Sequence, residues 1–333
     1  MLTFPALLVE AGSNAQDVRV GIREIGIDDL PPGEVLIDVW YSGINYKDAL
    51  ATTPYGKVVR RYPMVPGIDL SGVVAESSSS AFREGDQVLV TGYDLGTNHY
   101  GGFSRYARVP AQWVVRLPQG LNLRDAMALG TAGLTAAMAI DALQKHGLDP
   151  ATGPVLVTGA TGGVGSIALN ILADQHYDVS ASTGKLAHDY LTELGASRIV
   201  PREDVSAPSK RPLEHELWAG AIDSVGGSTL EYLLRTTRYG GSVSAFGMTG
   251  GTQLSTSVFP FILRGIHLLG IESAQCPYDY RQEMWQRLAT VWRPSHLDQI
   301  ANHTVGLEEL PTTVEQLLNG KNVGRVVVNM HGS

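Results

Sequence analysis

The chain has 333 residues, of which 44% are hydrophobic and 17% are charged, and its formal net charge is −8. This length exceeds what one hydrophobic core usually serves, so we expect two domains. The negative charge argues against a nucleic acid or a membrane surface as a partner. Cys276 is the single cysteine, which excludes an intramolecular disulfide and a cysteine-cluster zinc site.

The first third of the chain is predicted to be mostly β, because short runs of β-forming residues alternate with turn sequences. Residues 45–52 are expected to form a short helix. The expected strands cover residues 7–10, 35–41, 70–75, 87–91 and 113–117.

From residue 124 the pattern changes to a long helix over 124–146, followed by strands and helices in alternation. Such alternation predicts a parallel, doubly wound sheet whose ligands bind at the carboxyl ends of its strands. Strands are expected at 155–157, 178–183, 198–200, 221–224, 241–246, 266–272 and 324–329, and helices at 166–172, 188–194, 228–238, 280–292 and 307–320. The last segments are expected to return to the first domain.

Residues 155–165, Val-Leu-Val-Thr-Gly-Ala-Thr-Gly-Gly-Val-Gly, join an apolar strand to a helix through a glycine cluster. A tight turn of this kind leaves backbone N–H groups unpaired at a helix N-terminus, where the helix dipole favours a pyrophosphate. Glycine permits the close approach of phosphate to backbone. The motif therefore predicts a dinucleotide site.

The cofactor is predicted from the end of the next strand. An acidic residue there would select NAD, but this chain has Ser182-Thr183-Gly184-Lys185. A hydroxyl and a cation suit a 2′-phosphate, and Arg202 would supply a second cation. NADPH is therefore expected, although Lys185 and Arg202 would also be ordinary as solvated surface charges.

Six further segments are distinctive: residues 45–50 (Asn-Tyr-Lys-Asp-Ala-Leu), 66–69 (Pro-Gly-Ile-Asp), 98–102 (Asn-His-Tyr-Gly-Gly), 130–133 (Gly-Thr-Ala-Gly), 218–223 (Trp-Ala-Gly-Ala-Ile-Asp) and 260–264 (Pro-Phe-Ile-Leu-Arg). Together they resemble the medium-chain dehydrogenase/reductase superfamily, and within it the zinc-free, quinone-oxidoreductase-like group and its NADPH-dependent acrylyl-CoA reductase branch. The resemblance implies a β-rich GroES-like catalytic domain over 1–123 and 268–333, and a Rossmann NADPH-binding domain over 124–267.

Zinc-bearing members of the superfamily carry a cysteine and a Gly-His-Glu at the active site. The comparable positions here read Ile44 and Gly67-Ile68-Asp69, so no catalytic metal is expected. Asp69 and Asp223 are interpreted as structural carboxylates that bind backbone or cap turns, since neither has an evident partner carboxylate for acid–base work.

The resemblance also implies roles for individual residues. Tyr46 reaches the nicotinamide end of the cofactor. The pyrophosphate is held by Thr161, Gly162, Gly163 and Val164, and the 2′-phosphate by Thr183, Gly184, Lys185 and Arg202. The cofactor cleft between the domains is lined by Met248, Phe261, Ser273 and Asn319.

The expected reaction is hydride transfer to the β-carbon of an α,β-unsaturated thioester, followed by protonation of the α-carbon. Asn45 and Tyr46 are the nearest polar candidates for stabilising the thioester oxygen, and Tyr46 is also a candidate proton donor. Lys57, Arg60 and Arg61 form a basic cluster that would attract the phosphates of CoA, or would simply keep the surface soluble.

Two alternatives stay open at the level of sequence. A quinone or general enone reductase would share the cofactor residues, and an NADPH-binding structural or sensing protein would share the fold without turnover. We also expect a homodimer that pairs through the 266–272 strand. The chain start lacks a basic n-region, and no uninterrupted apolar run is seen that would span a bilayer, so a cytoplasmic protein without a membrane partner is expected.

Overall fold

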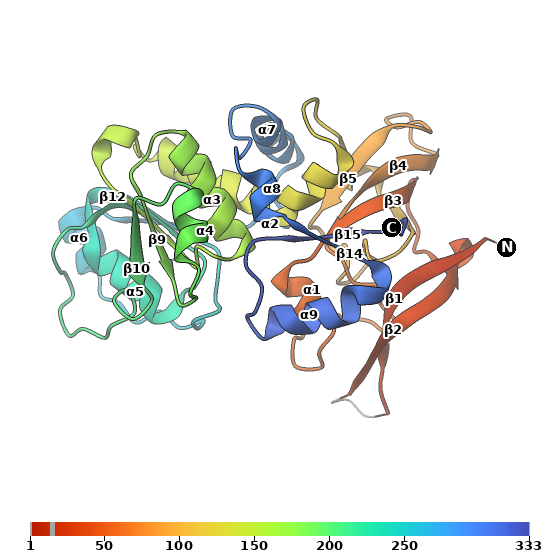
Figure 1. The fold of residues 1–333 in the computed structure, drawn as a ribbon, viewed down its shortest axis with the longest axis horizontal. Helices are drawn as coiled ribbons and strands as arrows, with labels where there is room; N and C mark the ends of the chain where they lie inside the picture. Colours follow the sequence, from red (N-terminus) through yellow and green to blue (C-terminus); the bar gives the residue numbers. More distant parts are fainter. Residues whose placement is uncertain (1, 14–16, 333) are drawn as a thin grey trace. The chain divides into compact units, whose positions relative to one another are not determined.

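The computed structural model describes residues 2–13 and 17–332, which form two compact units (Figure 1). The first unit comprises Met1–Thr131, Ala274–Ala289 and Leu297–Ser333, and the second comprises Ala132–Ser273 and Thr290–His296. These divisions fall a few residues beyond the sequence-based boundaries at 123/124 and 267/268, and residues 290–296 join the second unit.

The described part of the first unit contains a seven-stranded sheet in the order β14-β15-β3-β4-β5-β7, with β6 also paired to β3, and a separate β1-β2 hairpin. Because β15 pairs with β3, the last strand of the chain belongs to this sheet. The strands are β1 (Thr3–Ala11), β2 (Val18–Gly26), β3 (Val35–Gly43), β4 (Asp69–Ser77), β5 (Gln87–Thr91), β6 (Tyr106–Val109), β7 (Val115–Arg116), β14 (His303–Gly306) and β15 (Val326–Asn329). The α-helices are α1 (Tyr46–Ala51), α7 (Tyr278–Ala289), α8 (Leu297–Ile300) and α9 (Leu310–Leu318).

The described part of the second unit is a six-stranded sheet in the order β10-β9-β8-β11-β12-β13, and every neighbouring pair is parallel. Helix α3 packs on β8 and β9, α4 on β10, and α5 and α6 on β12 (Figure 1). The elements are β8 (Val155–Thr158), α3 (Gly163–Asp174), β9 (Val179–Thr183), α4 (His188–Glu193), β10 (Arg198–Pro201), β11 (Trp218–Asp223), α5 (Gly227–Thr236), β12 (Thr237–Ala245), α6 (Phe259–Arg264) and β13 (His267–Gly270). This arrangement confirms the predicted doubly wound parallel sheet.

Helix α2 (Leu123–Lys145) contains the change from the first unit to the second. It is long and apolar enough to cross a membrane by length and composition, which corrects the expectation that no such segment exists. In the structure 89% of its most apolar window is buried inside the protein, as in the core helix of a soluble protein.

Some local predictions were wrong. Residues 113–117 form a 3₁₀ turn (Ala111–Trp113) and only a two-residue strand, because only Val115 and Arg116 pair with β5. Strands β2, β6 and β14 and helix α6 were not predicted. Strand β2 is half-exposed and rich in charge, so it lacks the apolar run that marks a buried strand.

Candidate functional site

The glycine-rich turn lies at the carboxyl end of β8, where a parallel sheet binds its ligands. Gly159 has a φ of +58°, and a Cβ on Gly165 would lie 2.5 Å from the Gly159 carbonyl oxygen. Only glycine permits this close contact between the turn and α3. Gly162 is the N-cap of α3 and offers no side-chain cap, so the first backbone N–H groups of α3, at Gly163 and Val164, suit an anion.

The residues predicted to hold the 2′-phosphate lie together at the ends of β9 and β10. The hydroxyls of Thr161 and Thr183 are 2.9 Å apart, and the backbone N–H of Lys185 donates to the Thr183 hydroxyl over 3.1 Å. A Cβ on Gly184 would lie 3.3 Å from Nε of Arg202. Burial, and then the charge of Arg202, lower the pKa of Lys185. An anion between these two cations would relieve their repulsion.

The four residues predicted to line the cofactor cleft are distributed over both units. Met248 is exposed and follows the carboxyl end of β12, and the hydroxyl of Ser273 is 2.7 Å from that of Thr135. Phe261 packs against the hydrophobic core of the second unit, on the helix that leads into β13. Asn319 is the exposed C-cap of α9. Their roles toward the cofactor remain predictions.

Tyr46 is the first residue of α1, in the first unit, and 46% of it is exposed. Asn45 directly precedes it and is half-buried. The Asn45 amide nitrogen donates to Asp69 over 2.7 Å, to Asp48 over 3.2 Å and to the Gly43 carbonyl over 3.3 Å. Both of its hydrogens are therefore directed at protein acceptors, so Asn45 orients its neighbours, whereas Tyr46 is open to a ligand.

Asp69 is fully buried and lies at the centre of a polar network that sequence reasoning did not foresee. It accepts hydrogen bonds from the Thr131 hydroxyl (2.5 Å) and the Thr131 backbone (2.9 Å). A second carboxylate, that of Asp48, lies close by, because the Asn45 amide nitrogen donates to both Asp48 and Asp69. The expectation that Asp69 lacks a partner carboxylate was therefore wrong. Asp223, in the second unit, accepts from Thr158 and from two backbone N–H groups after β11, as expected of a turn cap.

Arg325 supplies the cation of the network from the residue before β15. Its side chain is 3% exposed, and Nη2 lies 3.6 Å from the Asp69 carboxylate. Nη2 also donates to the carbonyl of residue 127, Nε donates to the carbonyl of residue 128, and Nη1 donates to the carbonyl of residue 44 and to the Asn45 side-chain oxygen. Burial lowers the pKa of Arg325, and the charges of Asp69 and Asp48 oppose this effect. The sequence offered one indication of this role, an arginine at the start of an apolar final strand.

The bend in α2 belongs to the same network. Gly130 has a φ of +52°, and a Cβ there would lie 2.3 Å from an Asp69 carboxylate oxygen. A side chain at this position would therefore displace the carboxylate, and the bend turns the backbone N–H of Thr131 toward it. The predicted helix 124–146 gave no sign of this bend.

The basic cluster lies on the exposed loop after α1. Lys57, Arg60 and Arg61 are all exposed, and Tyr55 and Tyr62 on the same loop are 68% and 40% exposed. The loop therefore carries both exposed cations and exposed aromatic rings, a combination that suits phosphate and a base.

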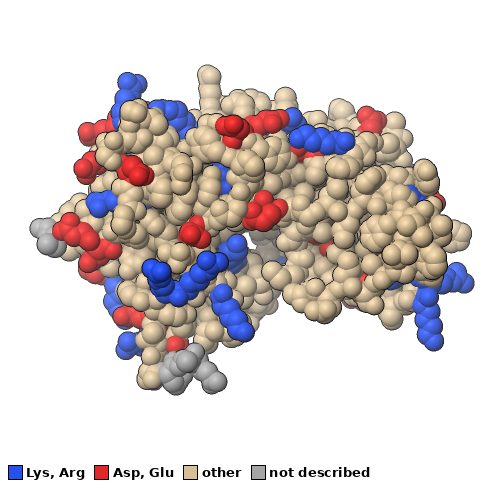
Figure 2. Space-filling view, turned by 180° about the vertical axis from the view of Figure 1, so that it is seen from behind, with Lys and Arg blue, Asp and Glu red and all other residues tan. Residues whose placement is uncertain are grey.

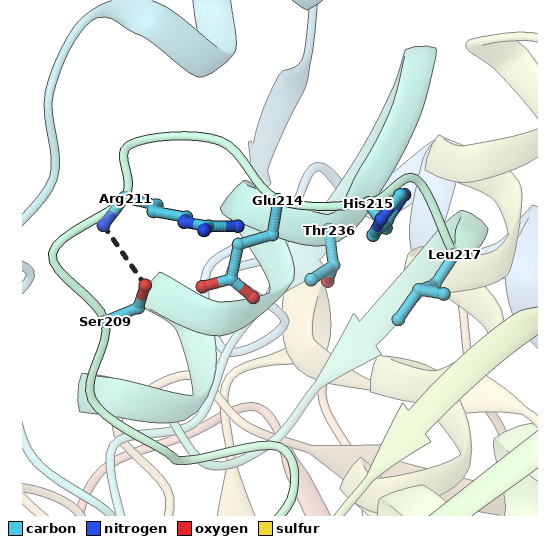
Figure 3. A pocket seen from close by; sticks show the side chains of 6 residues that line it. All are labelled: Ser209, Arg211, Glu214, His215, Leu217 and Thr236. Carbon is cyan, nitrogen blue, oxygen red and sulfur yellow. Dashed lines mark hydrogen bonds between the residues drawn. The ribbon is translucent and has the colours of Figure 1, made fainter.

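A cavity of about 340 Å³ lies elsewhere in the second unit, lined by Ser209, Arg211, Glu214, His215, Leu217 and Thr236 (Figure 3). Leu217 immediately precedes β11, so this cavity is at the amino edge of the sheet, opposite the glycine turn.

Across the face shown in Figure 2, acidic and basic side chains are scattered among other residues. Among the described residues, no three His, Cys, Asp or Glu side chains are grouped to hold a metal ion.

Comparisons with known proteins agree with this arrangement. Residues 31–119 match the alcohol dehydrogenase GroES-like domain, and residues 163–290 match the zinc-binding dehydrogenase family. The chain is 46% identical to acrylyl-CoA reductase AcuI of Ruegeria pomeroyi, over 98% of this chain and 99% of the relative. It is 48% identical, over 98% of this chain and 99% of the relative, to Bacillus subtilis YhfP, whose name provisionally assigns it as a quinone oxidoreductase.

Solved structures extend the likeness to the fold. The oxidoreductase YhdH of Salmonella enterica, in complex with NADP, matches with a TM-score of 0.94 and 42% identity, over 98% of this chain and 99% of that one. The structure of YhfP with NAD bound matches with a TM-score of 0.96, over 99% of this chain and all of that one.

A GroES-like unit joined to a Rossmann unit with this glycine turn defines an oxidoreductase of the medium-chain dehydrogenase/reductase superfamily. The resemblance seen in the sequence is thereby confirmed. Within the superfamily, the chain belongs to the acrylyl-CoA reductase branch.

Proposed function

We propose that the protein reduces the α,β double bond of acrylyl-CoA to give propanoyl-CoA, with NADPH as cofactor and without zinc. The observation that carries the cofactor assignment is the cluster of Thr183, Lys185 and Arg202 at the strand ends. It fits a 2′-phosphate, and YhdH was crystallised with NADP. The substrate assignment rests on AcuI and on the basic loop.

Bound NADPH would supply the hydride that is added to the β-carbon. The first N–H groups of α3 would hold its pyrophosphate, and Lys185 and Arg202 its 2′-phosphate. In the first unit, the network around Asp69 fixes the start of α1, which presents Tyr46. The Tyr46 hydroxyl would bind the thioester oxygen or deliver the proton to the α-carbon.

The exposed loop after α1 would bind the CoA moiety. Lys57, Arg60 and Arg61 would bind its phosphates, and Tyr55 and Tyr62 are exposed on the same loop for stacking on adenine. Reversing the charge of Arg60 and Arg61 should raise KM for acrylyl-CoA and leave KM for NADPH unchanged. Equal effects on both values would contradict the CoA assignment.

Reduction of quinones or simple enones is the second candidate, because YhfP carries a quinone oxidoreductase name and its structure holds NAD. Oxidation of NADPH with acrylyl-CoA, free acrylate and a quinone, measured in parallel, separates the two. The highest kcat/KM should be that for acrylyl-CoA. Comparable rates with the quinone would favour the general reductase, and no turnover with any acceptor would favour a binding protein.

We further propose that the enzyme is a cytoplasmic homodimer. Strand β13 is an edge strand of the second sheet within the described residues. The preceding segment exposes Val258, Phe259, Ile262 and Leu263, between 44% and 68% of each residue. An apolar edge of this kind invites pairing, and a second copy of the chain would cover it.

A further inference from the structure

Asp48, on α1, is completely buried and was not among the predicted site residues. One carboxylate oxygen accepts from the backbone N–H of Asn45 (2.8 Å) and from the Asn45 side-chain amide (3.2 Å). The other accepts from the backbone N–H of Ile68 (2.8 Å). The carboxylate thus joins the start of α1 to the segment before β4 through three N–H donors.

The charged groups around Asp48 come from several elements. Asp69, on β4, adds a second carboxylate, and Arg325, before β15, adds one guanidinium. Helix α9 packs against α1, and its one charged side chain, Glu315, is exposed, as is Lys47 on α1 itself. The buried cluster therefore contains two carboxyl groups and one permanent cation.

The groups around Asp48 shift its pKa in opposite directions. Burial, and then the charge of Asp69, raise the pKa of Asp48 to about 7, while the N–H groups of Asn45 and Ile68 act in the other direction. Protonation removes the negative charge of this carboxyl, so its hydrogen bonds from Asn45 and Ile68 are no longer charge-assisted. All three bonds weaken, and the position of Asn45 is then held less firmly.

We propose that Asp48 is a positioning residue for the reduction: its carboxylate holds Asn45 and the first turn of α1, and thereby Tyr46, in the arrangement that turnover requires. Protonation of Asp48 loosens this turn and lowers turnover. The inference rests on the proposed function only where turnover is the readout.

The first test is the pH dependence of kcat with NADPH and acrylyl-CoA. Below about pH 7, kcat should fall about tenfold per pH unit, as for loss of one essential ionised group. Asp48→Asn offers a donor where the carboxylate offers an acceptor and thus resembles the protonated state. This variant should turn over at least about tenfold more slowly, without that acidic limb, and with an unchanged KM for NADPH.

Two variants complete the set. Asp48→Glu should restore part of kcat and the acidic limb. Asp141→Asn removes a carboxylate that is also buried, on α2 in the second unit and paired with Lys145, and should keep the wild-type profile. An unchanged acidic limb in Asp48→Asn would overturn the proposal.

A second measurement needs neither turnover nor a folded Asp48→Asn variant. With ¹³C-labelled aspartate and tyrosine in the wild-type protein, one carboxyl signal, absent from Asp48→Glu, should titrate near pH 7. The Tyr46 ring signal, assigned by its absence from Tyr46→Phe, should shift with the same midpoint. A Tyr46 signal that ignores this titration would overturn the proposal. Lack of turnover with every acceptor would overturn only the proposed reaction.

Discussion

Tyr46 and Asn45 are neighbours in sequence, yet the structure separates their roles. The amide of Asn45 is fully engaged by Asp69, Asp48 and Gly43, whereas Tyr46 is 46% exposed. A side chain whose donors are all used inside the protein has none left for a substrate oxygen. The chemical role is therefore expected at Tyr46, and the expected role of Asn45 is to hold Tyr46 in its orientation.

Replacing Tyr46 with Phe removes only the hydroxyl. If this group delivers the proton, kcat should fall by about 10²–10⁴, the usual contribution of a general acid, with little change in KM for NADPH. Tyr239→Phe is a suitable control, because Tyr239 is 77% exposed in the second unit. Turnover of Tyr46→Phe within a few-fold of wild type would assign the proton to water or another residue.

Replacing Arg202 with Ala removes one of the two cations proposed for the 2′-phosphate. Loss of a charge-assisted hydrogen bond of about 1.5–3 kcal/mol should weaken NADPH binding by about 10- to 150-fold and leave NADH binding nearly unchanged. Titration calorimetry with both cofactors measures this difference. Arg211→Ala, at the amino edge of the sheet, is the control. Equal losses for NADPH and NADH would contradict the 2′-phosphate assignment.

Sequence reasoning located individual residues best where a short motif carries the chemistry. The glycine turn and the Thr183–Lys185 segment were found this way, and the structure gathers Thr161, Thr183, Lys185 and Arg202 at the same strand ends. The Asp69 network was not predicted, because its members come from four segments that are distant in sequence. No local pattern indicates that Arg325 pairs with Asp69 or that its charge acts on Asp48, since this depends on how segments distant in sequence pack together.

At the scale of elements, the turn between β8 and α3 depends on the absence of a side chain at Gly165. In Gly165→Ala the new Cβ would meet the Gly159 carbonyl at 2.5 Å, so the turn must shift. We expect a loss of about 1–3 kcal/mol in the free energy of unfolding, as for overpacking, together with weaker NADPH binding. Gly306→Ala should do neither, because its Cβ meets only Glu309 at 3.7 Å. Urea unfolding and cofactor titration measure both effects.

The regular elements were predictable to the extent that their patterns are local. Strand β5 was expected with its exact bounds, and β8, with all four residues buried, follows directly from its apolar run. Helix α3 begins at Gly163, three residues before the expected start. Its first turn contains glycines, which are unfavourable inside a helix, so no pattern in the sequence indicated that they are helical. The bend at Gly130 depends on the distant Asp69, so periodicity alone does not reveal it.

For the whole molecule, the buried carboxyl of Asp48 links stability to pH. Because its pKa is raised from 3.8 to about 7, the folded state holds a proton that the unfolded state has lost between these values. The contribution of this bound proton to the free energy of unfolding is complete below pH 3.8 and is lost as the pH rises through about 7. In this window the free energy of unfolding should fall by up to about 1.4 kcal/mol per pH unit relative to Asp48→Asn. Urea unfolding at pH values across the window measures the difference, and parallel curves would contradict it.

Assembly is the property of the whole molecule that the exposed edge of the second unit bears on. If a second copy covers the edge at β13, static light scattering should give twice the chain mass of 35.7 kDa. Ile262→Asp would place a charge in that contact and should shift the protein toward the monomer, because an unpaired buried charge is costly. Val291→Asp is a matched control, since Val291 is 67% exposed and Ile262 is 68% exposed. A wild-type monomer would show that the apolar edge is tolerated without a partner, whereas dissociation by both variants would place the contact elsewhere.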